Sequence, residues 1–307
     1  MRVRAAGLCG TELHFVDGLY APANVPITLG HEVAGDVSAV GRGVGDFTTG
    51  DRVVVNYYLF CARCTWCLRG LQQHCAQLRG LFAFVSDGGF AEYVTVPAHC
   101  LVRLPTGIDF APAATLCCSV TTSLHAVAVA EIGVGENVVV VGAGGVGLSL
   151  VQVARLRGAR VIAVSRSASK RRAAEDLGAA LSGPPEHIVG LVRDFTDGAG
   201  ADVVFELVGR TATMPLAVQM LGKRGRLVFI GYSADALMID PLALVVAEQR
   251  VLSSVGNTHS ELELAVDLAD RRHIRPVVDN VRPLDEINDG LDRLRRGDVV
   301  GRLVLKP

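Results

Sequence analysis

The sequence predicts an α/β protein in which a mixed domain is interrupted by a doubly wound parallel sheet. The chain has 307 residues, which is long for one core, and half of them are hydrophobic, with 34 glycines in all. Short β-branched runs alternate with helical patterns in its second part, as in parallel sheets. We place the mixed domain at 1–122 and 257–307 and the parallel-sheet domain at 123–256.

The mixed domain begins with short strands separated by glycine. The stretches EVAGDVSAVGRGVGDF, from residue 32, and GDRVVV, from residue 50, predict twisted antiparallel strands with glycine turns. Near the end of the chain, LDEINDGLDRLRRG predicts an amphipathic helix and GRLVLKP a final strand. We expect these early and late segments to belong to one domain.

The inserted domain contains apolar runs that predict buried strands: NVVVV, RVIAV, DVVFE, RLVFI and VLSSV. The stretches GLSLVQVARLRG and SASKRRAAEDLG between them predict helices. In the second helix, Ser169 is the expected N-cap and Gly178 the expected C-terminal stop.

Charge and hydropathy narrow the class of protein. The formal net charge is −1, so the chain as a whole has no electrostatic attraction for nucleic acid or anionic membranes. We find no apolar run of the ~18 residues that a membrane helix needs, and the start is not that of a signal peptide. A cytoplasmic location is therefore expected.

A glycine-rich loop predicts a dinucleotide site. Gly142, Gly144 and Gly147 have the G-x-G-x-x-G spacing, after an apolar strand and at the start of a helix. The first glycine allows the tight turn, the second lets the backbone approach a pyrophosphate, and the third lets the helix pack on the strand. The alternative is a turn that binds nothing.

The loop after the next strand bears on cofactor choice. An NAD enzyme usually places Asp or Glu there, about 20 residues beyond the glycine motif, to bind the ribose 2′-hydroxyl. This chain has Ser165 followed by Arg166, with Lys170 one turn later. A hydroxyl and a guanidinium suit a 2′-phosphate, so we expect NADP(H) in preference to NAD(H). Alternatively, Ser165 caps the strand and Arg166 points to water.

Four cysteines in the lobe 60–76 predict a structural zinc. Cys61, Cys64, Cys67 and Cys75 follow C-x2-C-x2-C-x7-C, which can surround one ion tetrahedrally. In a reducing compartment such a cluster favours metal over disulfides. Four thiolates leave no open coordination position, so this metal is not expected to take part in the chemistry.

A catalytic zinc needs ligands that leave one position free, and Cys₂His is one such set. Cys9, His31 and either Cys117 or Cys118 could supply it. These segments are far apart in sequence, so spacing leaves open the alternatives of a buried thiol or a core histidine.

Seven motifs occur in one order along nearly the whole chain: CGTELH, GHEVAG, the four-cysteine lobe, DGGFAEYV, LCCSVTT, GAGGVG and GRLVL. In these motifs the chain resembles the zinc-dependent alcohol dehydrogenases of the medium-chain dehydrogenase/reductase family. The resemblance implies a GroES-like catalytic domain and a Rossmann domain. It also implies that Cys9, His31 and Cys117 bind catalytic zinc, with Glu32 as an acid that can approach the metal.

The resemblance implies further roles. Thr11 matches the family's proton-relay hydroxyl and His14 its outlet to water, while Tyr20 and Tyr57 would line the substrate pocket. Cofactor contacts are expected also at Gly145, Val146, Val208 and Arg302. The expected reaction is hydride transfer between an alcohol and its aldehyde or ketone and a nicotinamide cofactor, in a homodimer or homotetramer that pairs near VLSSVGN.

Two further expectations concern the start of the chain and the rival activities. Family members have more residues before the CGT loop, whereas Met1 lies eight residues before Cys9. We therefore expect an exposed sheet edge, poor expression, and rescue by an upstream extension. The alternative functions are a zinc-free enoyl or quinone reductase of the same fold and a cofactor-binding protein without catalysis.

Overall fold

The computed structural model describes residues 1–20 and 25–307, which divide into two compact units. The first unit comprises Met1–Thr121 and Gly256–Pro307, and the second comprises Thr122–Val255. Each boundary lies one residue from the position expected from the sequence. The second unit therefore starts and ends close to where the pattern of apolar runs changes.

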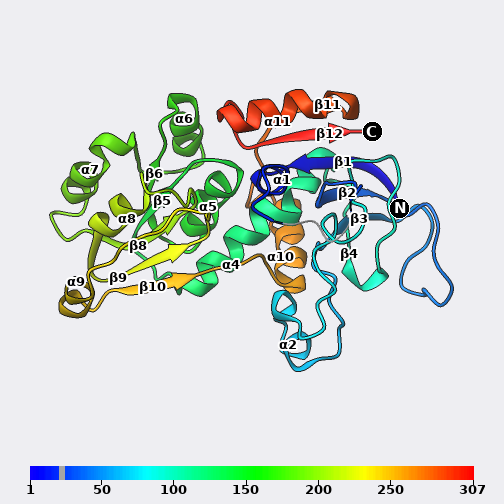
Figure 1. The fold of residues 1–307 in the computed structure, drawn as a ribbon, viewed down its shortest axis with the longest axis horizontal. Helices are drawn as coiled ribbons and strands as arrows, with labels where there is room; N and C mark the ends of the chain where they lie inside the picture. The colour runs from blue at the N-terminus through cyan, green and yellow to red at the C-terminus, as the bar shows by residue number, and fades with distance from the viewer. Residues whose placement is uncertain (21–24) are drawn as a thin grey trace. The chain divides into compact units, whose positions relative to one another are not determined.

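The first unit is built on a six-stranded sheet in the order β11-β12-β1-β2-β3-β4 (Figure 1). The β1 strand pairs antiparallel with β12 and with β2, whereas β11 pairs parallel with β12. Its strands are β1 (Arg2–Leu8), β2 (Glu32–Asp36), β3 (Arg52–Val55), β4 (Leu101–Arg103), β11 (Val278–Pro283) and β12 (Arg302–Lys306). The last strand of the chain thus lies beside the first. This is the arrangement expected when both ends of the sequence belong to one domain.

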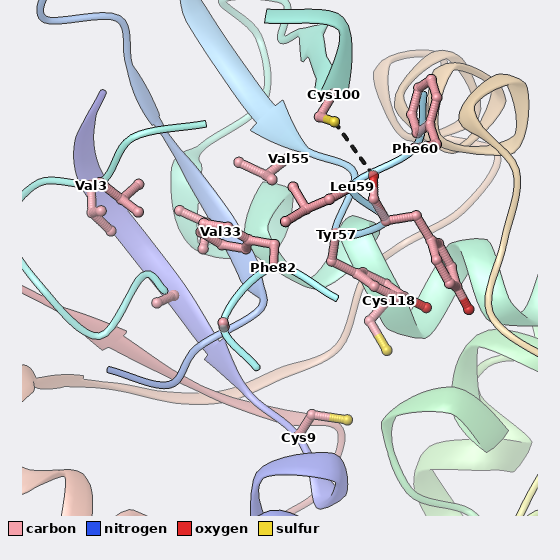
Figure 2. Packing of buried hydrophobic residues seen from close by; sticks show 14 of the residues in the cluster. Val3, Cys9, Val33, Val55, Tyr57, Leu59, Phe60, Phe82, Cys100 and Cys118 are labelled. Carbon is pink, nitrogen blue, oxygen red and sulfur yellow. Dashed lines mark hydrogen bonds between the residues drawn. The ribbon is translucent and has the colours of Figure 1, made fainter. Parts of the chain in front are cut away.

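Short helices and a buried apolar cluster complete this unit. Val3, Val33, Val55 and Phe82 pack in one cluster, which Figure 2 shows from close by. Val3, Val33 and Val55 lie in strands, where the alternation of side chains brings them to one face of the sheet, and Phe82 packs on them from a turn. The helices of the unit are α1 (Gly10–Val16), α2 (Thr65–Leu68), α3 (Phe110–Thr115), α10 (His259–Asp270) and α11 (Ile287–Arg296).

The second unit is built on a six-stranded sheet in the order β10-β9-β8-β5-β6-β7, and all of its pairs are parallel. Its strands are β5 (Asn137–Val141), β6 (Arg160–Val164), β7 (Leu181–Gly183), β8 (Ala201–Glu206), β9 (Leu221–Phe229) and β10 (Arg250–Ser253). The central strands β5 and β8 are almost wholly buried, as their β-branched runs predict. The predicted α/β class is confirmed.

Helices connect the strands of this sheet (Figure 1). They are α5 (Gly145–Leu156), α6 (Ala168–Asp176), α7 (Ile188–Phe195), α8 (Met214–Met220) and α9 (Pro241–Ala247). The N-cap of α6 is Ser167, whose hydroxyl accepts the Lys170 backbone N–H at 3.4 Å. The predicted cap, Ser169, was wrong because the helix begins earlier, at Ala168, so that Ser169 lies inside the first turn.

One helix of the described residues is long and apolar enough to cross a membrane by length and composition. It runs Phe110–Ala130 and consists of α3, a π-helical segment (Leu116–Val120) and α4 (Thr121–Ala130). The expectation of no such run was therefore wrong. Within the helix's most apolar 18-residue window, 83% is buried inside the protein, as in the core helix of a globular protein. A single buried helix of this kind is weak evidence for a membrane span.

Candidate metal centre and cofactor site

Four candidate metal ligands meet in the first unit. Cys9 lies between β1 and α1, His31 directly precedes β2, whose first residue is Glu32, and Cys118 lies in the π-helical segment. One ligand atom from each of these residues lies within 4.8 Å of all the others, and all four side chains are buried. Antiparallel pairing places Glu32 opposite Gly7, where a Cβ would stand 2.1 Å from the Glu32 carboxylate. Glycine at this position thus makes room for the Glu32 side chain.

The structure places Cys118 in this cluster and leaves Cys117 out of it. The Cys118 sulfur points toward the region where the Cys9 sulfur lies (Figure 2). The Cys117 thiol donates instead to the Val33 carbonyl at 3.4 Å. Successive side chains on a helix point in different directions, so only one of the two cysteines can face the cluster. The expectation that Cys117 reaches the other candidate ligands is therefore corrected, because Cys118 is the cysteine that lies among them, and the ligand role itself stays a prediction.

Both cysteines belong to the π-helical segment Leu116–Val120. Such segments inside α-helices occur frequently at functional sites. Helical periodicity alone does not reveal an extra residue of this kind in the turn. Spacing therefore left Cys117 and Cys118 as equivalent candidates, and the resemblance selected Cys117, whereas the backbone path brings Cys118 to the other candidate ligands.

Glu12 is a site residue that the sequence reasoning missed. Its buried carboxylate lies 2.5 Å from His31 Nδ1 and accepts the Cys9 backbone N–H at 3.0 Å. One carboxylate thus orients two candidate ligands, and a histidine bound to metal usually donates its other nitrogen to such a group. The sequence does contain a sign of this role: Glu12 stands three residues after the N-cap residue Cys9, which is the spacing of a capping box.

Arg302 provides a buried positive charge beside the cluster. Its Nε donates to the Glu32 carboxylate at 2.9 Å, and a terminal nitrogen donates to the Cys9 sulfur at 3.3 Å. Burial raises the pKa of Glu32 to about 7, although the Arg302 charge opposes the shift. The expected cofactor contact of Arg302 stays a prediction, since this guanidinium is engaged by protein groups of the first unit.

The two cluster thiols differ in their protein surroundings. A hydrogen bond from Cys118 and the positive charge of Arg302 lower the pKa of Cys9 well below its usual value, although burial opposes them. The same hydrogen bond, together with burial, raises the pKa of Cys118. Among the protein groups alone, Cys9 is therefore the cysteine predisposed to be the thiolate, which is the form that binds metal.

The four lobe cysteines have the geometry of a tetrahedral site. Zn–S bonds of ~2.3 Å imply sulfur–sulfur edges of ~3.8 Å in a regular tetrahedron. The sulfur of Cys67 lies 4.0 Å from that of Cys61 and 3.5 Å from that of Cys64, and the Cys64 and Cys75 sulfurs lie 3.8 Å apart. Backbone N–H groups, first that of Cys67, lower the pKa of Cys64 to about 6. These distances and donors fit zinc.

Of the residues expected to relay the proton or to line the substrate pocket, some contact the candidate zinc ligands and others are exposed to solvent. Thr11 Oγ1 lies 3.6 Å from the Cys9 sulfur, and His14 follows on the same helix, α1, partly exposed. The Tyr57 ring meets the His31 ring edge-on, with centroids 5.2 Å apart, whereas Tyr20 is 42% exposed. Phe84, which the sequence did not single out, packs on His31 at 5.6 Å. Tyr57 and Phe84 thus form an apolar wall at the histidine.

The glycine loop of the second unit has the backbone geometry that its motif predicts. Gly142 has a φ of 106°, a left-handed conformation that favours glycine. A Cβ on Gly147 would stand 1.9 Å from the Gly142 carbonyl oxygen, so the helix packs directly on the turn. A Cβ on Gly144 would meet nothing within 4 Å, which leaves an open approach at the start of α5, where Gly145 and Val146 follow. These features fit a bound pyrophosphate.

The loop after β6 is held by an arginine that the sequence reasoning missed. Arg171 donates to the backbone carbonyls of Ser165 and Arg166, at 2.8 and 2.9 Å. The Ser165 hydroxyl accepts the Ser167 N–H at 3.3 Å. The expected 2′-phosphate contacts of Ser165, Arg166 and Lys170 stay predictions. Arg171 adds a further positive charge to this loop.

Family models match both units of the chain. The alcohol dehydrogenase GroES-like domain matches residues 1–106, and the zinc-binding dehydrogenase domain matches residues 145–271. The first match contains Cys9, His31 and the four-cysteine lobe, and the second begins at the start of α5. The predicted GroES-like and Rossmann-type organisation is confirmed.

Individual relatives cover the whole chain. An alcohol dehydrogenase of Geobacillus stearothermophilus is 33% identical over 311 residues, which cover 100% of this chain and 90% of the relative. An NAD-dependent alcohol dehydrogenase of Sulfurisphaera tokodaii is 32% identical, with 100% and 92% covered. The crystal structure of an alcohol dehydrogenase from Aeropyrum pernix aligns with a TM-score of 0.94 at 34% identity, covering 100% of this chain and 91% of that one. This chain therefore belongs to the zinc-type alcohol dehydrogenases of the medium-chain dehydrogenase/reductase family.

Proposed function

We propose that the protein interconverts an alcohol and its aldehyde or ketone, with one catalytic zinc at Cys9, His31 and Cys118, one structural zinc in the lobe, and NADP(H). The observation that carries the proposal is the buried cluster, in which two sulfurs, an imidazole nitrogen and a carboxylate oxygen lie within 4.8 Å of one another. Two cysteines and one histidine are a known catalytic zinc set.

Charge balance supports this ligand set. The thiolates of Cys9 and Cys118 together balance the charge of one Zn²⁺, and a neutral His31 adds none. Bound there, zinc supplies Lewis acidity to an alcohol or carbonyl oxygen, and the nicotinamide cofactor supplies hydride transfer. Glu32 stays paired with Arg302, which leaves one ligand position to the substrate.

The side chains around the candidate zinc ligands would transfer the proton of the substrate hydroxyl to solvent and keep water away from His31. Thr11, whose hydroxyl lies beside the Cys9 sulfur, would accept the proton of the substrate hydroxyl, and His14 would pass it to bulk water. Glu12 holds His31 in one orientation through Nδ1, so that Nε2 is left to bind metal. Tyr57 and Phe84 exclude water at His31. This wall favours an alcohol with an apolar body, and Tyr20 would contact its outer end.

Paired cysteine variants test the metal assignment. Cys118→Ala should abolish turnover and lower the zinc content from two ions per chain to one, because the lobe keeps its metal. Cys117→Ala should keep both ions and most activity, at a stability cost of about 1–2 kcal/mol for the lost buried group. Full activity in Cys118→Ala would refute the assignment. Wild-type protein with zinc in the lobe alone, together with enone reduction, would indicate a zinc-free reductase.

The preference for NADP(H) rests on the loop after β6. It lacks a carboxylate at Ser165, and Arg166, Lys170 and Arg171 bring positive charge. The S. tokodaii relative is named NAD-dependent, so membership of the family does not determine the cofactor. We expect a higher kcat/KM with NADP than with NAD, and a reversed ratio in Ser165→Asp, whose carboxylate repels a 2′-phosphate. Equal or better use of NAD by the wild type would overturn this preference.

The proposed assembly is a cytoplasmic homodimer or homotetramer. The edge strand β10 and the helix α9 expose apolar side chains, among them Leu242, Val245 and Val246, each at least 70% exposed. Leu242, Val245 and Val246 are spaced i, i+3 and i+4 along α9 and so share one face of the helix, and exposed apolar surface of this kind is typical of contacts between subunits. A second copy of the chain is the partner that we propose for it.

A further inference from the structure

The two groups of candidate zinc ligands in the first unit are joined by one buried cluster. This cluster contains Cys9 and Cys118 of the candidate catalytic site, and also Cys67 and Cys75 of the lobe. Figure 2 shows Cys9 and Cys118 together with Phe60, which directly precedes the first cysteine of the lobe. Because protein interiors are close-packed, a displacement at one side of such a cluster is transmitted to its neighbours. The conformation of the lobe can therefore influence the geometry of the candidate catalytic ligands.

A side chain of the lobe also completes the N-terminus of α10. The first N–H groups of a helix have no partner within the helix itself. In α10 the Thr258 hydroxyl accepts the Glu261 N–H at 3.1 Å. The N–H of His259, the first residue of the helix, donates instead to the side-chain oxygen of Gln72 in the lobe, at 3.1 Å. The His259 ring also meets the Phe60 ring, with centroids 5.9 Å apart. The helix therefore begins on the lobe.

The same helix contacts the segment that carries Cys118. Figure 1 shows the lobe, marked by α2, at the end of α10 where the bond from His259 is made. Further along, α10 packs against the π-helical segment, and all five residues of that segment are buried. The buried residues of α10 are Leu262, Ala265 and Val266, whose spacing places them on one face of the helix. One helix thus connects the lobe to the backbone that directs the Cys118 sulfur.

We propose that Gln72 is a positioning residue through which the lobe stabilises the candidate catalytic zinc site. Its side-chain oxygen fixes the start of α10, and α10 in turn holds the π-helical segment that brings Cys118 toward Cys9. The Gln72 oxygen is directed to α10, so the residue acts without being a metal ligand. The inference rests on the proposed catalytic zinc, and it gives the lobe a role at that site besides holding its own metal.

Gln72→Met tests this role, because methionine has about the length of glutamine but offers the His259 N–H no oxygen. We expect the affinity of the catalytic site for zinc to fall about 5- to 10-fold, as for coupling between separate sites, and that of the lobe to stay within about twofold. The measurement is the zinc content after dialysis against increasing chelator. Cys118→Ala, which should hold zinc in the lobe alone, shows at which chelator concentration the lobe ion is released.

Three further variants separate this role from a merely structural one. In Gln72→Glu a carboxylate can accept the same N–H and suits a helix N-terminus, so both zinc affinities should equal those of the wild type. Gln77→Met is the matched control, because the Gln77 oxygen accepts from Arg63 within the lobe, at 3.2 Å, and should leave both affinities unchanged. Gln72→Asn, whose side chain is one methylene shorter, carries the test if Gln72→Met does not fold.

The outcomes distinguish this inference from the proposed function. Weaker binding of the catalytic ion alone in Gln72→Met, together with wild-type affinities in Gln72→Glu, supports the role of Gln72. The role is overturned if the lobe ion is weakened as much or more, if neither ion is affected, or if Gln72→Glu or Gln77→Met shows an equal loss. A folded wild-type protein that holds zinc in the lobe alone refutes the proposed catalytic zinc, and the inference with it.

Discussion

Glu12 Oε1 lies 2.5 Å from His31 Nδ1, and the other oxygen of the same carboxylate accepts the Cys9 backbone N–H at 3.0 Å. The geometry of the candidate zinc ligands therefore depends on a residue that would bind no metal. Because both contacts are buried, neither is weakened by water, and the orientation of two candidate ligands is coupled to the first turn of α1.

We predict that Glu12→Gln lowers the affinity of the catalytic site for zinc by about 10- to 100-fold, the usual effect of removing such a partner. The measurement is the zinc content after dialysis against increasing chelator, with the lobe zinc as internal reference. Glu261→Gln is the matched control, because Glu261 accepts the Thr258 N–H in the capping box of α10. Equal zinc loss from both variants would contradict the role of Glu12.

Two glycines of the nucleotide loop should behave in opposite ways. Gly147→Ala places a methyl 1.9 Å from the Gly142 carbonyl oxygen and should destabilise the second unit by about 3 kcal/mol. Gly144→Ala meets no atom within 4 Å, so Tm should be unchanged, but the methyl should weaken cofactor binding because it intrudes where the pyrophosphate approaches. Calorimetric Tm and cofactor Kd separate the two effects. Unchanged cofactor affinity in Gly144→Ala would argue against the assigned site.

His259 should make the first unit sensitive to acid. Burial lowers its pKa below the ordinary 6.5, and the nearby His99 adds to the shift while Glu263 opposes it. The unfolded chain therefore binds the proton more readily, and stability falls as the pH drops through about 6.5 toward the folded pKa. When Tm is measured as a function of pH, His259→Gln should make Tm fall less steeply over this pH range. His273→Gln, at an exposed position, is the control and should leave the profile as in the wild type.

The apolar surface of α9 and β10 predicts self-association. Val245 and Val246 are 74% and 75% exposed. Charging both, in a Val245→Glu and Val246→Glu double variant, should shift the sedimentation coefficient toward the monomer, because a buried unpaired carboxylate opposes association. Val134→Glu is the control, at a valine that is 89% exposed but lies outside this surface. A wild-type monomer at micromolar concentration would contradict the proposed assembly.

Features that depend on neighbours in sequence were predicted well. The parallel strands follow from β-branched runs, and the grouping of the lobe cysteines follows from their short spacing. Features that depend on the direction of a side chain, or on contact with a residue far away in sequence, were not predicted. Cys117 and Cys118 are chemically identical, and only a π-helical turn decides which one reaches Cys9. Glu12 was overlooked because its partner, His31, lies 19 residues away and on another element.

The spacing of the two cysteine sets also bears on the order in which the protein matures. The lobe closes on itself within 14 residues, from Cys61 to Cys75, so its loop-closure entropy is small. This stretch can capture a metal ion while the rest of the chain is still unfolded, since zinc binding supplies folding free energy to short peptides. Cys9 and Cys118 meet only after distant segments have docked. Loading should therefore be sequential, and a chain synthesised under zinc shortage would fill the lobe first and accumulate as a folded but inactive species.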